Sequence, residues 1–423
     1  MRFQISSVMD AIEQRLTTDL TGAQAVVDIG QVVRFVDLDG GRPVNLVRVG
    51  MVLDALSRYL VDEGALLYGV CARELLSEAA LTSKERMVLG RWTDEGMIEV
   101  TPDDGERALE LADLTGLPLI TLADPPQEAA ARFGWLADGA GVRVLRLVAR
   151  GGVAALMPAD SVETSEDAAQ RVIAAAKVPS AELTDGTAEL PLPAEVLTGR
   201  AAARMSHTRV GRGRFLRAEP AEEAAGLLAR TWRCDGFDCP AFGDRRAVGQ
   251  PVPRVRDGLP VCPRHDEPVV DIGPRQAAYP VSIIVDDLPR QRLVVHEGTP
   301  VLVGRDDDDP DVVSVGRWLH EAAAAWVSPV HLRLEARPEG LVITDLSENG
   351  TVVWQRRGPD DRGAARALRR AAYELGGWDA VELYTGIALM RGDRRLAAVL
   401  GRDEPASVLV DAPTAAHQQL SAD

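Results

Sequence analysis

Four residues with metal-binding side chains lie in two short groups in the second half of the chain. Cys234 and Cys239 are separated by four residues, and Cys262 and His265 by two, with 22 residues between the groups. Three of the four cysteines of the chain fall in this pattern. Thiolates and imidazoles are preferred ligands of Zn²⁺, and a tetrahedral site needs four of them on two short turns. The pattern C-x4-C-x22-C-x2-H therefore predicts a structural zinc ion bound by these residues.

The spacer between the two groups contains several Gly and Pro residues, which supply turns for a small hairpin. Residues 231–275 resemble a zinc ribbon with Cys-Pro-Arg-His as its second knuckle. All four ligands would be protein groups, so the site would be closed and structural. The alternative is that Cys234 and Cys239 are ordinary buried cysteines and that His265 is exposed. Cys71 lies in an apolar run, and we expect it to be a core thiol.

A second group of polar residues follows short strand-like runs in the last third of the chain. Turn signals separate these runs from residue 279 to 400, which predicts an all-β sandwich. The polar motifs are Gly304-Arg305, Ser328-x-x-His331 and Asn349-Gly350-Thr351. A Ser and a His three residues apart could indicate hydrolysis, but the sequence shows no orienting acid or oxyanion hole for them.

These motifs, in this order, resemble the forkhead-associated (FHA) domain over residues 278–402. The resemblance implies an all-β sandwich with loops at one end that bind phosphothreonine peptides. The residues that it assigns to phosphopeptide binding are Arg305, Ser328, Asn349 and Ser347. The residues that it assigns to support of the site are Gly304, His331, Gly350 and Thr351.

These residue types suit a phosphothreonine ligand, because a phosphate with nearly two negative charges favours a guanidinium and a hydroxyl donor. Three features depart from the family pattern. Four aspartates, Asp306 to Asp309, follow Arg305 and would oppose an anionic ligand unless they point away. Pro329 stands where the family often has a basic residue, and a helical insertion lengthens the spacing from Arg305 to Ser328. The alternative is a degenerate domain that binds protein without phosphate.

The elements that precede these motifs predict a multidomain α+β protein with an N-terminal α/β region. Two runs joined by Asp39-Gly40-Gly41 predict a hairpin. Helices over 72–79 and 83–95, followed by a strand, resemble a winged helix, which we place in a first region, 1–105. Strand-like and helical runs alternate over 106–198 and predict a small α/β region. No phosphate-binding loop, HExxH or GxSxG motif occurs there.

Two further segments are defined by composition. Residues 199–230 begin with an Arg-rich stretch that lacks acidic residues, and we interpret them as a basic linker and helix. The alternative for this stretch is a contact with a nucleic acid or a partner. Residues 403–423 are polar with Pro and small residues, and we expect a flexible tail.

Charge and composition limit the classes of function. The 423-residue chain has a net charge of −17, which argues against broad, non-specific nucleic-acid binding. We expect no secretory leader and no membrane span, because Arg interrupts the apolar stretches. Few cysteines indicate a reducing, cytoplasmic location. Lysine occurs only at positions 84 and 177, which is typical of a GC-rich, actinobacterial genome.

The sequence therefore predicts a non-enzymatic signalling adaptor or regulator that binds a threonine-phosphorylated partner in a Ser/Thr kinase pathway. Two other classes stay open. One is a scaffold subunit of a multi-protein assembly with a degenerate FHA domain. The other is a DNA-binding transcription regulator that the FHA domain switches. An enzyme within residues 106–200 would need a deep pocket with paired ionisable groups.

Overall fold

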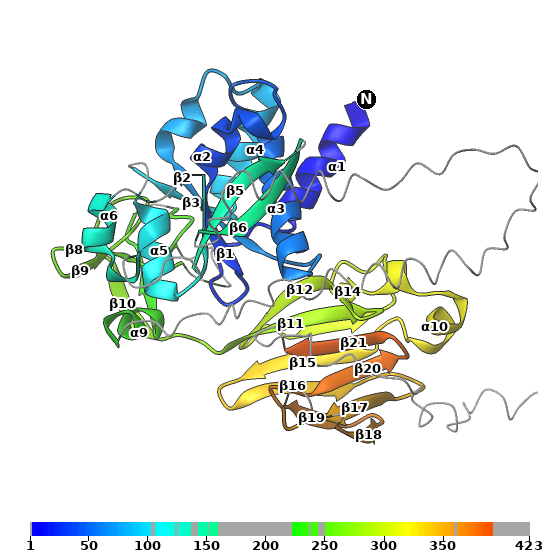
Figure 1. The fold of residues 1–423 in the computed structure, drawn as a ribbon. Coiled ribbons are helices and arrows are strands. Elements are labelled where there is room, and N and C mark those ends of the chain that lie inside the picture. Colours follow the sequence, from blue (N-terminus) through cyan, green and yellow to red (C-terminus); the bar gives the residue numbers. More distant parts are fainter. Residues whose placement is uncertain are drawn as a thin grey trace, which may run out of the picture.

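The computed structural model describes an α/β domain, a small cysteine-containing module and a β-sandwich (Figure 1). The described residues are 2–102, 106–122, 125, 127–136, 143–150, 152–159, 222–236, 238–243, 249, 251–358, 361 and 363–391. Most of the basic stretch expected within 199–230, and the whole tail expected over 403–423, lie outside these ranges.

The α/β domain is built on a six-stranded sheet with the order β3-β2-β1-β4-β5-β6. The first five strands in this order are parallel, and β6 pairs antiparallel with β5. The strands are β1 (Ala25–Asp28), β2 (Leu67–Ala72), β3 (Ile98–Thr101), β4 (Leu119–Thr121), β5 (Val144–Arg150) and β6 (Val153–Pro158). Their continuous apolar runs suit a sheet that is covered on both faces.

Helices cover the two faces of this sheet, and successive side chains of β1 serve different cores. Val27 packs with residues of the first four helices, whereas Val26 packs with residues of the fifth and sixth. The α-helices are α1 (Arg2–Glu13), α2 (Ile29–Arg34), α3 (Val47–Leu60), α4 (Ser83–Asp94), α5 (Arg107–Thr115) and α6 (Gln127–Arg132). The 3-10 helices are η1 (Val36–Leu38), η2 (Arg73–Ser77) and η3 (Gly134–Leu136).

This sheet corrects the expected division at residue 105. Strand β1 pairs with β2 on one side and with β4 on the other, so residues 1–105 and 106–158 share one core. The segment expected to be a winged helix is instead a crossover from β2 through η2 and α4 to the parallel strand β3. The buried side chains of Leu89 and Trp92 hold α4 against the sheet, which leaves it a packing helix.

The hairpin expected around Asp39-Gly40-Gly41 is also wrong, because this region is helical. Asp28 caps α2 through a 2.7 Å bond from the Gly30 amide to its side chain. The buried guanidinium of Arg48 then binds the Asp39 carboxylate at 2.7 Å, which fixes the loop between η1 and α3. Capping and ion pairing override the local turn signal here.

The C-terminal unit confirms the expected all-β sandwich. Its two sheets have the orders β12-β11-β21-β20-β17-β18 and β14-β13-β15-β16-β19. The strands are β11 (Ala278–Val285), β12 (Leu288–His296), β13 (Val301–Gly304), β14 (Val312–Ser314), β15 (Leu332–Arg337), β16 (Gly340–Asp345), β17 (Thr351–Gln355), β18 (Ala364–Leu368), β19 (Ala372–Leu375), β20 (Ala380–Tyr384) and β21 (Ile387–Arg391). The expected helical insertion is present as η5 (Gly316–Trp318) and α10 (Glu321–Trp326). Alternate side chains of both sheets form a common core.

A small module lies beside α5, shown in green in Figure 1. Its elements are α9 (Glu222–Leu228), β7 (Arg230–Arg233), β8 (Arg254–Arg256), β9 (Leu259–Val261) and β10 (Val270–Pro274). Strands β7 and β10 form an antiparallel pair, and β8 and β9 form a hairpin. Arg254 joins the module to α5 through two 3.1 Å bonds to the Glu110 carboxylate.

The sandwich contacts the α/β domain through the edge strand β12. Asp62, after α3, pairs with Arg292 at 2.5 Å, and both side chains are largely buried. The Glu63 amide donates to the Pro289 carbonyl at 3.0 Å. Close approach of the backbones requires a residue without a side chain at Gly64.

In the part of the chain that the structure describes, none of the helices has both the length and the hydrophobicity needed to cross a bilayer.

We expect Gly64→Ala to loosen the joint between the sandwich and the α/β domain. A Cβ at residue 64 would lie 2.8 Å from backbone atoms of Gln291 and Arg292, a clash worth about 1–3 kcal/mol. Hydrogen exchange of the Glu63 amide would measure this, and it should become faster. The control is Gly90→Ala in α4, where a Cβ meets nothing within 4 Å. Unchanged exchange in the Gly64 variant would contradict the tight joint.

Candidate functional site

Three loops meet at one end of the sandwich. The first loop begins at Gly304, the last residue of β13. A Cβ on Gly304 would lie 1.8 Å from the Pro329 carbonyl oxygen, so only glycine fits between the first and second loops. The Arg305 amide donates to the Ser328 carbonyl at 3.1 Å, whereas the Arg305 side chain is exposed. Among the described residues, no ion pair engages this guanidinium.

The second loop carries Ser328 and His331 between α10 and β15. The Ser328 amide donates to Nδ1 of His331 at 3.1 Å. The Ser328 hydroxyl accepts a 3.1 Å bond from the Glu348 amide of the third loop. The backbone of His331 continues the ladder, because its amide donates to the Val303 carbonyl at 2.8 Å. One imidazole therefore fixes the loop on which the serine is presented.

The second ring nitrogen of His331 anchors the third loop. His331 is fully buried, and its Nε2 lies 3.1 Å from the Thr351 hydroxyl. That hydroxyl donates to Asp345 at 2.6 Å, so it accepts the proton of Nε2. His331 is thus a neutral imidazole with its proton on Nε2. Burial lowers the pKa of His331 to about 4, against a smaller opposing effect of Asp345.

The third loop is closed by polar side chains that bind each other. The Ser347 hydroxyl donates to Asp345 at 2.7 Å and accepts the Gly350 amide at 2.8 Å. Gly350 has φ +88°, a left-handed conformation that favours glycine. The Asn349 side-chain amide donates to the Trp326 carbonyl at 2.8 Å, which ties this loop to α10. The side-chain oxygen Oδ1 of Asn349 is buried, and none of the described residues donates a hydrogen bond to it.

The structure brings all eight of the predicted residues together, but it gives one of them a different role. Ser347 is fully buried and both its donor and its acceptor are used within the loop, so it supports the site and is not exposed for a ligand. The predicted set omitted Asp345, which receives three hydrogen bonds, from Ser347, Thr351 and the Arg370 amide. Its position two residues before Ser347 in the motif was the only sequence signal for it.

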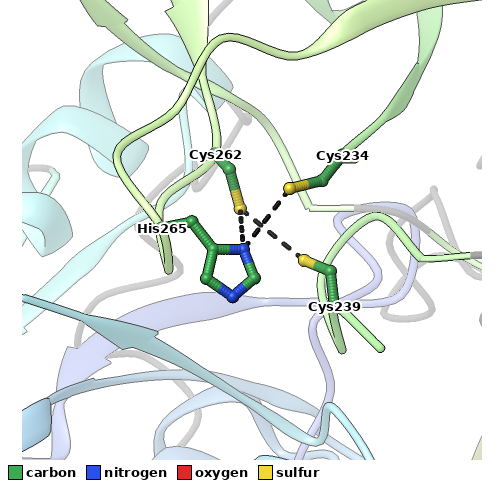
Figure 2. A group of neighbouring side chains, drawn as sticks. All are labelled: Cys234, Cys239, Cys262 and His265. Atoms are coloured by element: carbon green, nitrogen blue, oxygen red, sulfur yellow. Dashed lines mark hydrogen bonds between the residues drawn. The ribbon is translucent and has the colours of Figure 1, made fainter. Parts of the chain in front are cut away.

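The predicted metal ligands also form a cluster (Figure 2). The ligand atoms of Cys234, Cys239, Cys262 and His265 all lie within 4.8 Å of one another. Nδ1 of His265 is 3.3 Å from the Cys234 sulfur and 3.7 Å from the Cys262 sulfur, and the sulfurs of Cys239 and Cys262 are 3.6 Å apart. Ligands at bond lengths of about 2.0–2.3 Å in a tetrahedron are separated by roughly 3.3–3.8 Å. These residues could hold a metal ion.

Two turns position these ligands. Cys234 follows β7 directly, and Cys239 lies a few residues further along the same segment. Cys262 follows β9 directly, and His265 lies three residues after it. The backbone approaches the cluster closely at Gly236, where a Cβ would lie 2.6 Å from Nδ1 of His265. The Cys234 sulfur accepts the Gly236 amide at 3.3 Å. Backbone amides of this kind stabilise thiolate ligands.

The electrostatics of the thiols also favour a thiolate in the cluster. Hydrogen bonding from Cys262 lowers the pKa of Cys239 to about 5, although burial opposes this shift. Cys71 is fully buried, which confirms its predicted place in the core. This burial raises the pKa of its thiol to about 12. A buried neutral thiol of this kind is unreactive.

The α/β domain has a partly buried carboxylate at the point where open α/β sheets bind ligands. Its strand order reverses between β1 and β4, which is where open α/β sheets bind ligands. Asp28 ends β1 there, and burial raises its pKa, but its oxygens already accept bonds from Gly30 and Gln31. A cavity of about 10 Å³ between the sheet and the cysteine-containing module has room for one water molecule.

Comparisons with known proteins add only distant likenesses of fold. No family model matches the sequence, and no curated protein matches it. The FHA domain of the CT664 protein from Chlamydia trachomatis is 17% identical over 27% of this chain and 96% of that chain, with a TM-score of 0.20. The MEK1 FHA domain is 22% identical over 27% of this chain and 88% of that chain, with a TM-score of 0.21.

A third solved structure belongs to another class of protein. The nuclear protein-only RNase P 2 of Arabidopsis thaliana is 18% identical over 32% of this chain and 30% of that chain, with a TM-score of 0.26. At identities and TM-scores this low, none of these likenesses carries a functional conclusion to this chain. The function must therefore be argued from the geometry of its own residues.

We expect His331 to stay neutral in the folded protein down to about pH 4. The unfolded chain binds a proton below pH 6.5, so the free energy of unfolding falls as the pH falls from 6.5 to about 4. The total loss from this group is roughly 3 kcal/mol. NMR titration of the imidazole would measure its pKa directly. In His331→Gln this part of the pH dependence should vanish, and a folded-state pKa near 6.5 would contradict the burial argument.

Proposed function

We propose that the sandwich binds a threonine-phosphorylated protein and that the chain acts as a non-enzymatic signalling adaptor. The observation that carries the proposal is the exposed guanidinium of Arg305, which no ion pair engages among the described residues. Arg305 lies beside the loop of Ser328, whose carbonyl accepts the Arg305 amide and whose amide donates to the buried imidazole of His331. A guanidinium is a strong ligand for a phosphate dianion. The motifs of the FHA domain resemblance fall at this one end of the sandwich, as a phosphothreonine site requires.

The two loops offer a phosphate different donors. Arg305 supplies charge, and the Ser328 hydroxyl proton is free to point to the ligand because its oxygen accepts the Glu348 amide. Asn349 borders the same loops, and its Oδ1 has no hydrogen-bond partner in the part of the chain that the structure describes. A rotation of this amide would let it bind the backbone of a peptide. A pre-formed loop costs little conformational entropy on binding, which favours a reader of short peptides.

The same geometry supports a binding site over a catalytic one. A nucleophilic serine needs a base within hydrogen-bond reach of its hydroxyl. Nδ1 of His331 instead accepts the backbone amide of Ser328, and Nε2 is bonded to Thr351. The imidazole has no free nitrogen for proton transfer. We therefore infer that Ser328 acts as a hydrogen-bond donor.

We further propose that the cysteine-containing module binds a structural Zn²⁺ through Cys234, Cys239, Cys262 and His265. Three thiolates and one imidazole are ligands typical of zinc, and four protein ligands leave no open position for substrate. The metal would stabilise a module with few large apolar residues, which matches its small core of Trp232, Phe242 and the cysteines.

For the sandwich, we propose that a Ser/Thr kinase in the cytoplasm generates the phosphorylated partner.

The alternative of a DNA-binding regulator has less support. Helix α4 presents the exposed cations Lys84 and Arg86, but Arg91 is paired with Glu13, and Asp94 and Glu95 are exposed on the same helix. This mixed charge does not favour docking to a phosphate backbone. The alternative of a scaffold with a degenerate domain is supported by the acidic residues beside Arg305, so the decisive test is phosphate dependence.

Phosphothreonine peptides should bind the full chain with micromolar affinity, and Arg305→Ala should weaken binding by about 10- to 100-fold, because it removes a charge-assisted contact. Titration of a degenerate phosphothreonine library against the protein, with unphosphorylated peptides beside it, would measure this. The control is Arg333→Ala, an exposed arginine on β15 that pairs with Glu335. Binding without phosphate dependence would favour the scaffold.

The purified chain should contain about one zinc ion, and Cys262→Ser should lose it. Cys71→Ser is the matched control, since its thiol is buried in another core. Metal analysis gives the zinc content, and thermal unfolding with a chelator gives its contribution to stability. Full metal content in the Cys262 variant would exclude the proposed ligand set.

A further inference from the structure

The phosphothreonine site proposed above is bordered on one side by an unusual number of carboxylates. Five of the seven residues from 305 to 311 are aspartate. We call residues 306–311 the acidic loop. Its backbone begins beside the serine loop, because the Asp306 amide lies 3.3 Å from the Pro329 carbonyl. Glu348, which is exposed, adds a carboxylate on the third loop next to Ser328.

The acidic loop has a defined shape. The Asp308 amide bonds to the side chain of Asp306 at 3.0 Å, and the Asp311 amide bonds to the side chain of Asp309 at 3.0 Å. These two turns use Asp306 and Asp309 within the loop, whereas Asp307 and Asp308 are exposed. Asp307 is held near the start of the helical insertion, where a Cβ on Gly316 would lie 2.6 Å from its carboxylate.

The carboxylates do not neutralise the phosphate-binding cation. Among the described residues, neither the acidic loop nor Glu348 forms an ion pair with Arg305. A second exposed cation, Arg369, donates from its guanidinium to the backbone carbonyl of Asn349 at 3.4 Å. The exposed charged side chains of these loops are therefore of two kinds: a cationic part, Arg305 and Arg369, and an anionic part, the acidic loop with Glu348.

A phosphate dianion alone would meet repulsion from the anionic part. A ligand that carries cations beside its phosphate would satisfy both parts. Oδ1 of Asn349, a residue that is more than nine-tenths buried, has no hydrogen-bond partner among the described residues, which is an independent sign that the loops at this end of the sandwich lack a ligand. Charge complementarity of this kind sets specificity and association rate more than it sets affinity.

We propose that this site selects phosphothreonine segments that carry Arg or Lys beside the phosphothreonine. Arg305 and Ser328 bind the phosphate, while Asp307, Asp308 and Glu348 bind the flanking cations. Acidic phosphopeptides are rejected by the same carboxylates. The proposal rests on the proposed phosphothreonine function and names the class of ligand for it.

The test is a selection with the full chain from a phosphothreonine library in which the positions on both sides of the phosphothreonine are randomised. Arg and Lys should be enriched at flanking positions. A selected peptide should bind at least about threefold more tightly than the same peptide with Ala in place of its cations, and added salt should reduce the difference.

The variant Asp307→Asn with Asp308→Asn removes two charges and keeps side chains of the same shape. It should bind phosphothreonine peptides and lose most of the preference for flanking cations. The matched control is Glu339→Gln with Glu374→Gln, which removes two exposed charges near the β15–β16 turn, at the other end of these strands from Ser328. This control should keep the preference.

The outcomes separate the two proposals. Phosphate-dependent binding with neutral or acidic flanking residues, or with the same cation preference in both double variants, would overturn the specificity. Absence of any phosphate-dependent binding, with the Arg305→Ala variant indistinguishable from the parent protein, would overturn the phosphothreonine function itself.

Discussion

The neutral imidazole of His331 is the constraint on which the candidate site depends. One nitrogen accepts the Ser328 amide, the other is bonded through Thr351 to Asp345, and the backbone amide joins the β13 ladder. A buried polar group without partners costs roughly 1–3 kcal/mol, so these bonds must all form together. The network therefore orders three loops at once. A protonated imidazole could not accept the Ser328 bond, which links the shape of the site to the low pKa of His331.

Buried ion pairs join the three units of the protein in a related way. Arg107 is buried between Glu99 and the Val252 carbonyl, so it connects α5 and β3 to the segment between β7 and β8 of the cysteine-containing module. Burial raises the pKa of the nearby Glu110, but Arg254 and Arg107 outweigh burial and lower it below its ordinary value. Such pairs contribute less to net stability than to a unique arrangement, because desolvation offsets much of their attraction. They specify which surfaces meet.

The net charge of the protein limits how its proposed ligand can be recognised. A chain with net charge −17 repels anions at long range, so a phosphorylated segment must be recognised at short range by a few placed donors. The exposed guanidinium of Arg305 provides this contact, and the acidic loop beside it makes cations on the ligand favourable. The α/β domain holds the sandwich through the pair of Asp62 with Arg292 and the bond from the Glu63 amide to the Pro289 carbonyl.

The sequence by itself determined the features that depend on local spacing. The spacing of Cys234, Cys239, Cys262 and His265 along the chain was sufficient to predict their cluster. The resemblance of the motifs at Arg305, Ser328 and Asn349 to the FHA domain implied that their loops meet at one end of the sandwich. Short strand-like runs separated by turn signals predicted the sandwich, because both signals are local.

Only the tertiary structure decided the features that depend on pairing between distant segments. The expected hairpin and winged helix of the first region were local patterns, and the parallel pairing of β1 with both β2 and β4 replaced them with one sheet. The burial of Ser347 and the part played by Asp345 followed from three hydrogen bonds that meet at one carboxylate. Local spacing cannot reveal such contacts, because packing and the burial of polar groups are properties of the whole fold.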